Sequence, residues 1–239
     1  MKKLLSSTCF AFVFLGALLT MTAQDAEGFG TVQDEEAPSL TGVFTVDGSK
    51  TTETENVKDK TYTSNNADEC VLLIKDNAKA KVLNSIFNKA KGNVTNGGQS
   101  NFYGLNAVVV AQNGSTLTLK DVTITSNAEG ANAVFSTGEG STITIKNIKI
   151  HTTKNSSRGL DSTYGGVILA DNVDITTEGE HCAAFATDRG EGTVTVNGGS
   201  ANTSGEGSPV IYSTGNISVK NLSGKATGSE LAVIESYCQ

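Results

Sequence analysis

A pattern of apolar and polar residues returns about every two dozen residues between Asn106 and Ser236. Each repeat opens with a short β-prone run, and a matching run starts at Cys70. One column of these runs is apolar in every copy and consists of Leu72, Val108, Val134, Leu160, Ala184, Ile211 and Val233. Internal repetition of this kind predicts a solenoid, with that column as the spine of its core.

A second run in each repeat alternates apolar and polar residues, with Leu117 and Leu119 as the apolar positions of one copy. This alternation predicts another inward face. Two places beyond it stand Asp121, Asn147, Asn172, Gly198 and Asn221, which are 23 to 26 residues apart. These residue types tolerate positive φ, so a left-handed bend is expected once per repeat. A third apolar pair follows, as at Val122 and Ile124. The sequence therefore predicts an all-β parallel β-helix with three short strands per coil and about seven coils.

The N-terminus has the pattern of a signal peptide over residues 1–23. Lys2 and Lys3 precede an apolar run from Cys9 to Leu19, which is too short to span a bilayer, and cleavage is expected after Ala23. Residues 24–41 are polar and acidic without a period, and we expect a disordered linker. The solenoid domain is predicted over 42–239.

Within that domain, Val43–Val46 and Thr61–Thr63 are expected in an atypical first coil that caps the core. Residues 94–105 form an expected inserted loop. The last coil stops soon after its first strand, without a polar cap. We interpret the chain as truncated at its C-terminus; the alternative is that this edge pairs with another molecule, including a second copy.

Composition supports a thin solenoid core, with no Trp, two Pro and 26 Gly. Without Lys2 and Lys3 the chain has 16 basic and 25 acidic residues, a net charge of −9. An acidic surface argues against nucleic acid as a partner. Cys70, Cys182 and Cys238 fall in different coils, too far apart for an internal disulfide.

Several runs resemble a family of secreted right-handed β-helix proteins from gut-type bacteria, described as adhesin-like or autotransporter-like. The runs that carry the resemblance are FYGLNA at 102–107, SRGLDSTYGG at 157–166, ATDRGEG at 186–192 and SPVIYSTG at 208–215. The resemblance implies a right-handed β-helix of the pectate-lyase-like superfold. That superfold hosts lyases, hydrolases, adhesins and passive stalks, so it does not decide the activity.

Two columns on the first strand are expected to face outward. One contains the aromatic residues Phe135, Phe185 and Tyr212, interrupted by Asp161, and the other reads Thr137, Thr163, Thr187 and Thr214. Stacked aromatic and hydroxyl side chains can bind sugar rings or order water. The alternative is that both columns reflect only the β propensity of these residues.

A polar patch gathers the only two arginines of the chain, Arg158 and Arg189, beside Asp161, Tyr164, His181 and Asp188. Asp161 and Asp188 suggest the carboxylate pair of a glycoside hydrolase. Arg158 or Arg189 suggests instead the base or uronate clamp of a lyase. The alternative is a surface ion pair with a structural histidine.

No metal cluster or nucleotide-binding loop is evident, and no cofactor is expected. We therefore expect a secreted or surface-displayed protein that binds a polysaccharide or cell-surface ligand, without membrane insertion of the mature chain. A polysaccharide lyase or glycoside hydrolase is the alternative from another class, and a passive spacer is the third.

Overall fold

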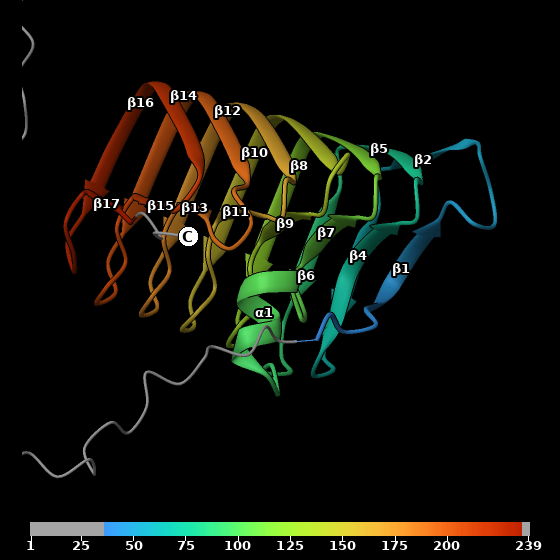
Figure 1. Cartoon of the computed structure of the whole chain (residues 1–239), viewed down its shortest axis with the longest axis horizontal. Coiled ribbons are helices and arrows are strands. Elements are labelled where there is room, and N and C mark those ends of the chain that lie inside the picture. The colour runs from blue at the N-terminus through green and yellow to red at the C-terminus, as the bar shows by residue number, and fades with distance from the viewer. Residues whose placement is uncertain (1–35, 236–239) are drawn as a thin grey trace, which may run out of the picture. The chain divides into compact units, whose positions relative to one another are not determined.

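The computed structural model describes residues 36–235, and these form an all-β parallel solenoid of about seven turns, as predicted (Figure 1). Each coil contributes to three faces. The first face is an eight-stranded parallel sheet of β1 (Thr41–Asp47), β4 (Glu69–Lys75), β7 (Val109–Gln112), β9 (Val134–Thr137), β11 (Leu160–Thr163), β13 (Phe185–Thr187), β15 (Ile211–Ser213) and β17 (Ala232–Ile234).

The second and third faces belong to one sheet that bends at a corner. In early coils the two faces have separate strands, β2 (Thr54–Lys58) and β3 (Thr61–Ser64), then β5 (Lys79–Leu83) and β6 (Ile86–Lys89). In later coils one strand of 11 residues runs through both: β8 (Thr116–Ser126), β10 (Thr142–Thr152), β12 (Val167–Thr177), β14 (Thr193–Thr203) and β16 (Asn216–Ala226). The predicted second and third strands are thus continuous.

The corner residues have the positive φ that their types predict. The φ angles are 54° at Asp121, 57° at Asn147, 59° at Asn172, 84° at Gly198 and 53° at Asn221. Asp59 and Asn84 extend the column to the first coils. Their side chains stack: the Asn147 amide donates to Asp121 at 2.7 Å and Asn172 donates to Asn147 at 3.0 Å. We call this row the corner ladder. It supplies hydrogen bonds to the polar side chains at a bend whose positive φ only Asn, Asp and Gly adopt easily.

Inward alternation on the second face is confirmed. Leu117, Ile143, Ile168, Val194 and Ile217 lie in one register, as do Leu119, Ile145, Ala170, Val196 and Val219. All but the two of the last strand are buried. These columns form the main core together with the spine of the first face.

The predicted spine of the first face needs three corrections. Its true members are Val109, Phe185 and Ala232, in register with Val134, Leu160 and Ile211. Val108, Ala184 and Val233 are one residue out of step. Apolar residues stand on both sides of each correct position, because the outer side of this face is covered too, so hydrophobicity alone cannot set the register.

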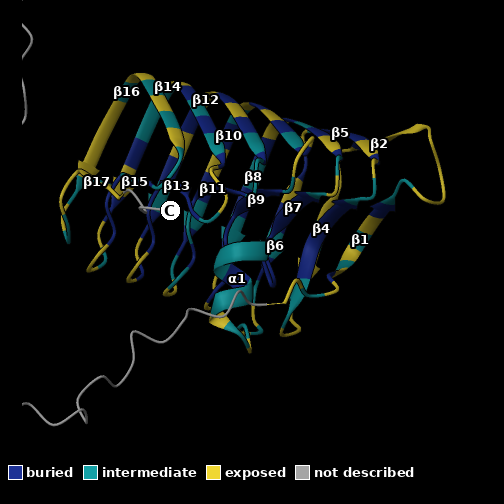
Figure 2. Ribbon diagram, in the orientation of Figure 1, coloured by how far each residue is buried: buried dark blue, intermediate teal, exposed yellow. Residues whose placement is uncertain are grey.

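The inserted loop contains a short helix, α1 (Gly97–Tyr103), that the sequence reading missed. The Asn96 side chain caps its start by accepting from Gln99 N at 3.0 Å, and Gly104 ends it at φ 76°. Under this insertion lies a second apolar cluster, on the outer side of the first face: Leu40, Cys70, Leu73, Leu105, Ala107, Val110 and Phe135. The dark strands β4, β7 and β9 in Figure 2 are buried on both sides.

The sequence predicts a disordered linker over residues 24–41, but residues 36–41 belong to the fold, and for them the prediction is wrong. Leu40 is buried in the second cluster, Glu36 O accepts from the Gln99 amide at 3.0 Å, and Thr41 begins β1. Residues 24–35 and the signal peptide at 1–23 lie outside the described residues. So does Cys238, whereas Cys70 and Cys182 are free and buried.

We predict that Asn147→Ala destabilises the fold more than Asn147→Gly. Both variants lose the two amide contacts of the corner ladder, but only alanine must also hold φ near 57° with a Cβ. That strain is of the order of 1 kcal/mol. Urea unfolding of both variants measures the difference. Equal stability of the two would contradict a role for the left-handed bend.

Candidate functional site

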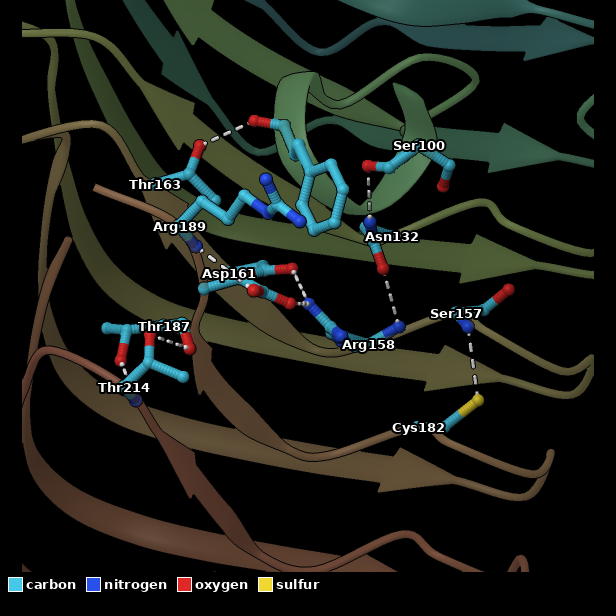
Figure 3. Close-up of polar contacts among 12 residues, drawn as sticks. Ser100, Asn132, Ser157, Arg158, Asp161, Thr163, Cys182, Thr187, Arg189 and Thr214 are labelled. Atoms are coloured by element: carbon cyan, nitrogen blue, oxygen red, sulfur yellow. Dashed lines mark hydrogen bonds and ion pairs between the residues drawn. The ribbon is translucent and has the colours of Figure 1, made fainter. Parts of the chain in front are cut away.

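The polar patch predicted from the rare arginines forms a buried charge cluster on the outer side of the first face. Arg158 precedes β11, Asp161 lies within it and Asp188 follows β13. One guanidinium nitrogen of Arg158 donates to Asp161 Oδ2 at 2.8 Å and to Asp188 Oδ2 at 3.1 Å (Figure 3). The side chain of Arg158 is 11% exposed and that of Asp161 is fully buried. Three residues of the predicted patch are therefore in direct contact.

Burial is the largest single influence on the pKa values of both Asp161 and Arg158. It raises the pKa of the Asp161 carboxyl from 3.8 to about 6, with Arg158 opposing the shift and Asp188 adding to it. Burial also disfavours the charged Arg158, but its ion pairs with Asp161 and Asp188 outweigh that effect and raise its pKa above the usual value. Arg158 thus stays a cation, shared by two carboxylates.

Helix α1 covers the cluster and uses several predicted site residues as anchors. Thr163 Oγ1 donates to Phe102 O at 2.8 Å, and it accepts from the Thr137 hydroxyl at 2.8 Å. The Arg189 guanidinium lies 4.4 Å from the centre of the Phe102 ring (Figure 3). Further along α1, the rings of Tyr103 and Tyr164 stack at 5.1 Å and their hydroxyls are 3.3 Å apart. Thr163, Tyr164 and Arg189 therefore contact the helix, and Thr137 contacts Thr163, so these four residues do not form an open surface.

The expected exposed aromatic and threonine columns are wrong in five members, because Thr137 and Thr163 are buried beside the insertion and three further residues are buried as well. Phe135 is fully buried under the insertion, and Phe185 points into the main core. Thr187 is buried opposite Ser162, where its hydroxyl accepts from Thr214 N at 3.1 Å. The register slip at Ala184–Phe185 causes the last two errors, and it moves Asp188 to the place expected for Thr187.

A pocket of about 280 Å³ opens beside the charge cluster, between α1 and three successive coils. We call it the Arg158 pocket. Its lining residues are Asn101, Ser156, Arg158, His181, Ala183, Gly207, Pro209 and Tyr212. It thus unites three predicted site residues, Arg158, His181 and Tyr212, and leaves Asp161 and Arg189 outside its lining.

Tyr212 is the aromatic wall of this pocket. The half-buried ring of Tyr212 lies 5.5 Å from the Arg158 guanidinium carbon, and its hydroxyl donates to Glu235 Oε2 at 2.9 Å. Across the pocket, His181 is exposed, and Gly207 leaves room for its ring: a Cβ on Gly207 would lie 2.8 Å from His181 Nδ1. Sequence reasoning missed Asn101, because nothing in an inserted loop indicates which coil it covers.

Within residues 36–235, no group of three or more His, Cys, Asp or Glu side chains is placed to hold a metal ion. In the same part of the chain, no helix combines the length and apolar character needed to cross a bilayer. Cys182 takes the position that Ser157 and Ser208 hold in neighbouring coils: its sulfur accepts from Ser157 N at 3.1 Å, and its N–H donates to Ser208 Oγ at 2.9 Å. Burial raises its pKa to about 11, which is typical of a structural thiol.

Comparison with protein-family models, with curated proteins and with solved structures found no match. The structure itself supports the parallel solenoid implied by the sequence resemblance.

We predict that the free energy of unfolding of the wild type, measured relative to that of Asp161→Asn, falls as the pH rises from about 4 to about 6. In this window the unfolded chain has lost the Asp161 proton while the folded chain still holds it, so ionisation progressively costs folded-state stability. The full change is of the order of 3 kcal/mol. Chemical unfolding across this pH range measures it.

Asp174→Asn is the matched control, because its side chain lies on the exposed side of β12 at 55% exposure. Its difference from the wild type should show no such fall. A flat or rising profile for Asp161→Asn would mean that the carboxyl ionises as readily in the fold as in the unfolded chain.

Proposed function

We propose that this protein is a secreted or surface-displayed binding protein whose solenoid presents the Arg158 pocket to a carbohydrate. The observation that carries the proposal is the combination of one half-buried aromatic ring, Tyr212, with the polar side chains of Asn101, Arg158 and His181 around one open pocket. An aromatic face packs on the C–H face of a sugar ring, and surrounding polar groups bind its hydroxyls. Secretion rests on the signal-peptide pattern of residues 1–23.

The construction of the pocket favours binding because its walls are preorganised. Its residues come from consecutive coils that are joined by parallel β pairing, from β11 to β13 and from β13 to β15. Asn101 comes from α1, which is fixed by the Thr163 and Arg189 contacts. A rigid site loses little conformational entropy when a ligand binds.

The charges favour a neutral glycan over a uronate. Arg158 is the cation nearest the pocket, but Asp161 and Asp188 already balance it. With both carboxylates ionised, the cluster carries one net negative charge, which repels an acidic sugar. The acidic composition of the chain acts in the same direction.

Binding is favoured over hydrolysis and elimination, the alternative function. A general acid must come within hydrogen-bond reach of the glycosidic oxygen, and the fully buried side chain of Asp161 has no access to the pocket. Arg158 is a poor base because its ion pairs raise its pKa. A passive spacer would need neither an aromatic wall nor a polar lining.

We predict that Tyr212→Ala weakens retention of the protein on a neutral glycan by about tenfold or more, as expected for an aromatic wall at the centre of a binding site. A panel of neutral glycans, pectins and alginates, read by affinity electrophoresis and then titration, identifies the ligand. Leu169→Ala is the control, since Leu169 is 42% exposed on the second face, away from the pocket lining.

The same samples are assayed for new reducing or unsaturated ends. Ends that appear with the wild type and disappear with Asp188→Asn would replace this proposal with the enzymatic one. Absence of retention on every glycan in the panel would favour a spacer.

A further inference from the structure

Besides the corner ladder, a column of positive φ runs along the turns that lead into the first face. It consists of Gly130, Ser156, His181 and Gly207, whose φ angles are 65°, 54°, 56° and 60°. Each stands four residues before the start of its strand, which is β9, β11, β13 or β15 in turn. The N–H of each of the first three donates to the carbonyl just before the next member, as His181 N does to Glu206 O at 2.9 Å. The four residues therefore occupy equivalent positions in successive coils.

Two members of this column are glycines, and the fold gives a reason for each. Glycine adopts positive φ without steric cost. A Cβ on Gly130 would collide with Val94 of the insertion, and a Cβ on Gly207 would lie 2.8 Å from His181 Nδ1. Ser156 and His181 hold the same backbone conformation with a Cβ, which is unfavourable for an L-residue. The two coils between the glycines thus carry a side chain at a backbone cost.

Both of these side chains line the Arg158 pocket, together with Tyr212. Ser156 is half-buried and His181 is exposed. Within residues 36–235, neither the Ser156 hydroxyl nor the His181 ring has a hydrogen-bond partner, so their polar atoms are available to a ligand. Backbone strain that the packing does not require is typical of functional sites.

Other positions with positive φ lack this combination. In the described part of the chain, Tyr164 and Glu191 are the remaining examples that are neither Gly, Asn nor Asp. Tyr164 has a structural reason, because its ring stacks on Tyr103 of α1. Glu191 is exposed in the turn between β13 and β14 and does not line the pocket. Glu191 therefore offers the same strain without the site.

We propose that Ser156 and His181 determine the specificity of the Arg158 pocket by hydrogen-bonding free hydroxyl groups of a sugar whose ring packs on Tyr212. The inference rests on the proposed carbohydrate function and adds the chemical feature that is recognised. A serine hydroxyl and a neutral imidazole each donate and accept, as a sugar hydroxyl does. An O-methylated sugar keeps C–H groups for Tyr212 but cannot donate, and its methyl groups need room beside both side chains. The pocket should therefore reject it.

The test compares starch, mixed-linkage β-glucan, galactomannan and xylan, each beside its O-methylated form. For every glycan that the wild type retains, we expect the O-methylated form to bind at least about tenfold more weakly. In the double variant Ser156→Gly/His181→Gly this ratio should fall to about threefold or less, because no hydroxyl-specific partner remains on that wall.

Urea unfolding separates recognition from packing. Glycine relieves the strain at both positions, so the midpoint of the double variant should be no lower than that of the wild type. Glu191→Gly is the matched control: it brings the same relief at φ 56° and should leave the binding ratio unchanged.

Three results would overturn the assignment and leave carbohydrate binding in place, provided that Tyr212→Ala still weakens retention. They are a wild type that binds both forms equally, a double variant that keeps the wild-type ratio, and a double variant whose midpoint falls below that of the wild type. Retention of none of the four glycans would overturn this inference together with the proposed function.

Discussion

The constraint on which this structure depends is the stacking of each coil on the one before it, through parallel hydrogen bonds, with every position held in a column. The corner ladder shows its strength most clearly. A bend that needs positive φ must occur at the same place in every coil, so the residue there is Asp, Asn or Gly from Asp59 to Asn221. Once the corner is fixed, the apolar columns on either side of it must point inward, and the core of the second and third faces follows.

The first face obeys the same stacking rule but has two cores. Helix α1 and residues 36–40 cover its outer side, so Leu73, Val110 and Phe135 are buried as deeply as the spine. This second core explains why the insertion follows a fixed path across the coils. It also places the Arg158 pocket at the margin of α1, beside the charge cluster.

Much of this architecture could be predicted from the sequence. The period, the corner residues and the inward pairs of the second face were all correct, because each rests on a strong local rule. The register of the first face was wrong at Ala184 and Phe185, since both are apolar and both sides of that strand are covered. Rarity correctly indicated Arg158, Asp161 and Asp188 as a group. Their burial could not be predicted, because it depends on where an inserted helix lands.

The buried charge cluster is best understood as the support of the Arg158 pocket. Two carboxylates taken from water are costly, and an apolar trio of similar volume would stabilise the solenoid at least as well. What the ion pairs add is position: they fix the Arg158 guanidinium beside the Tyr212 ring. Tyr212 is restrained in turn by Glu235, whose carboxylate accepts from its hydroxyl at 2.9 Å, so both the cation and the aromatic wall of the pocket are held by carboxylates that lie outside its lining.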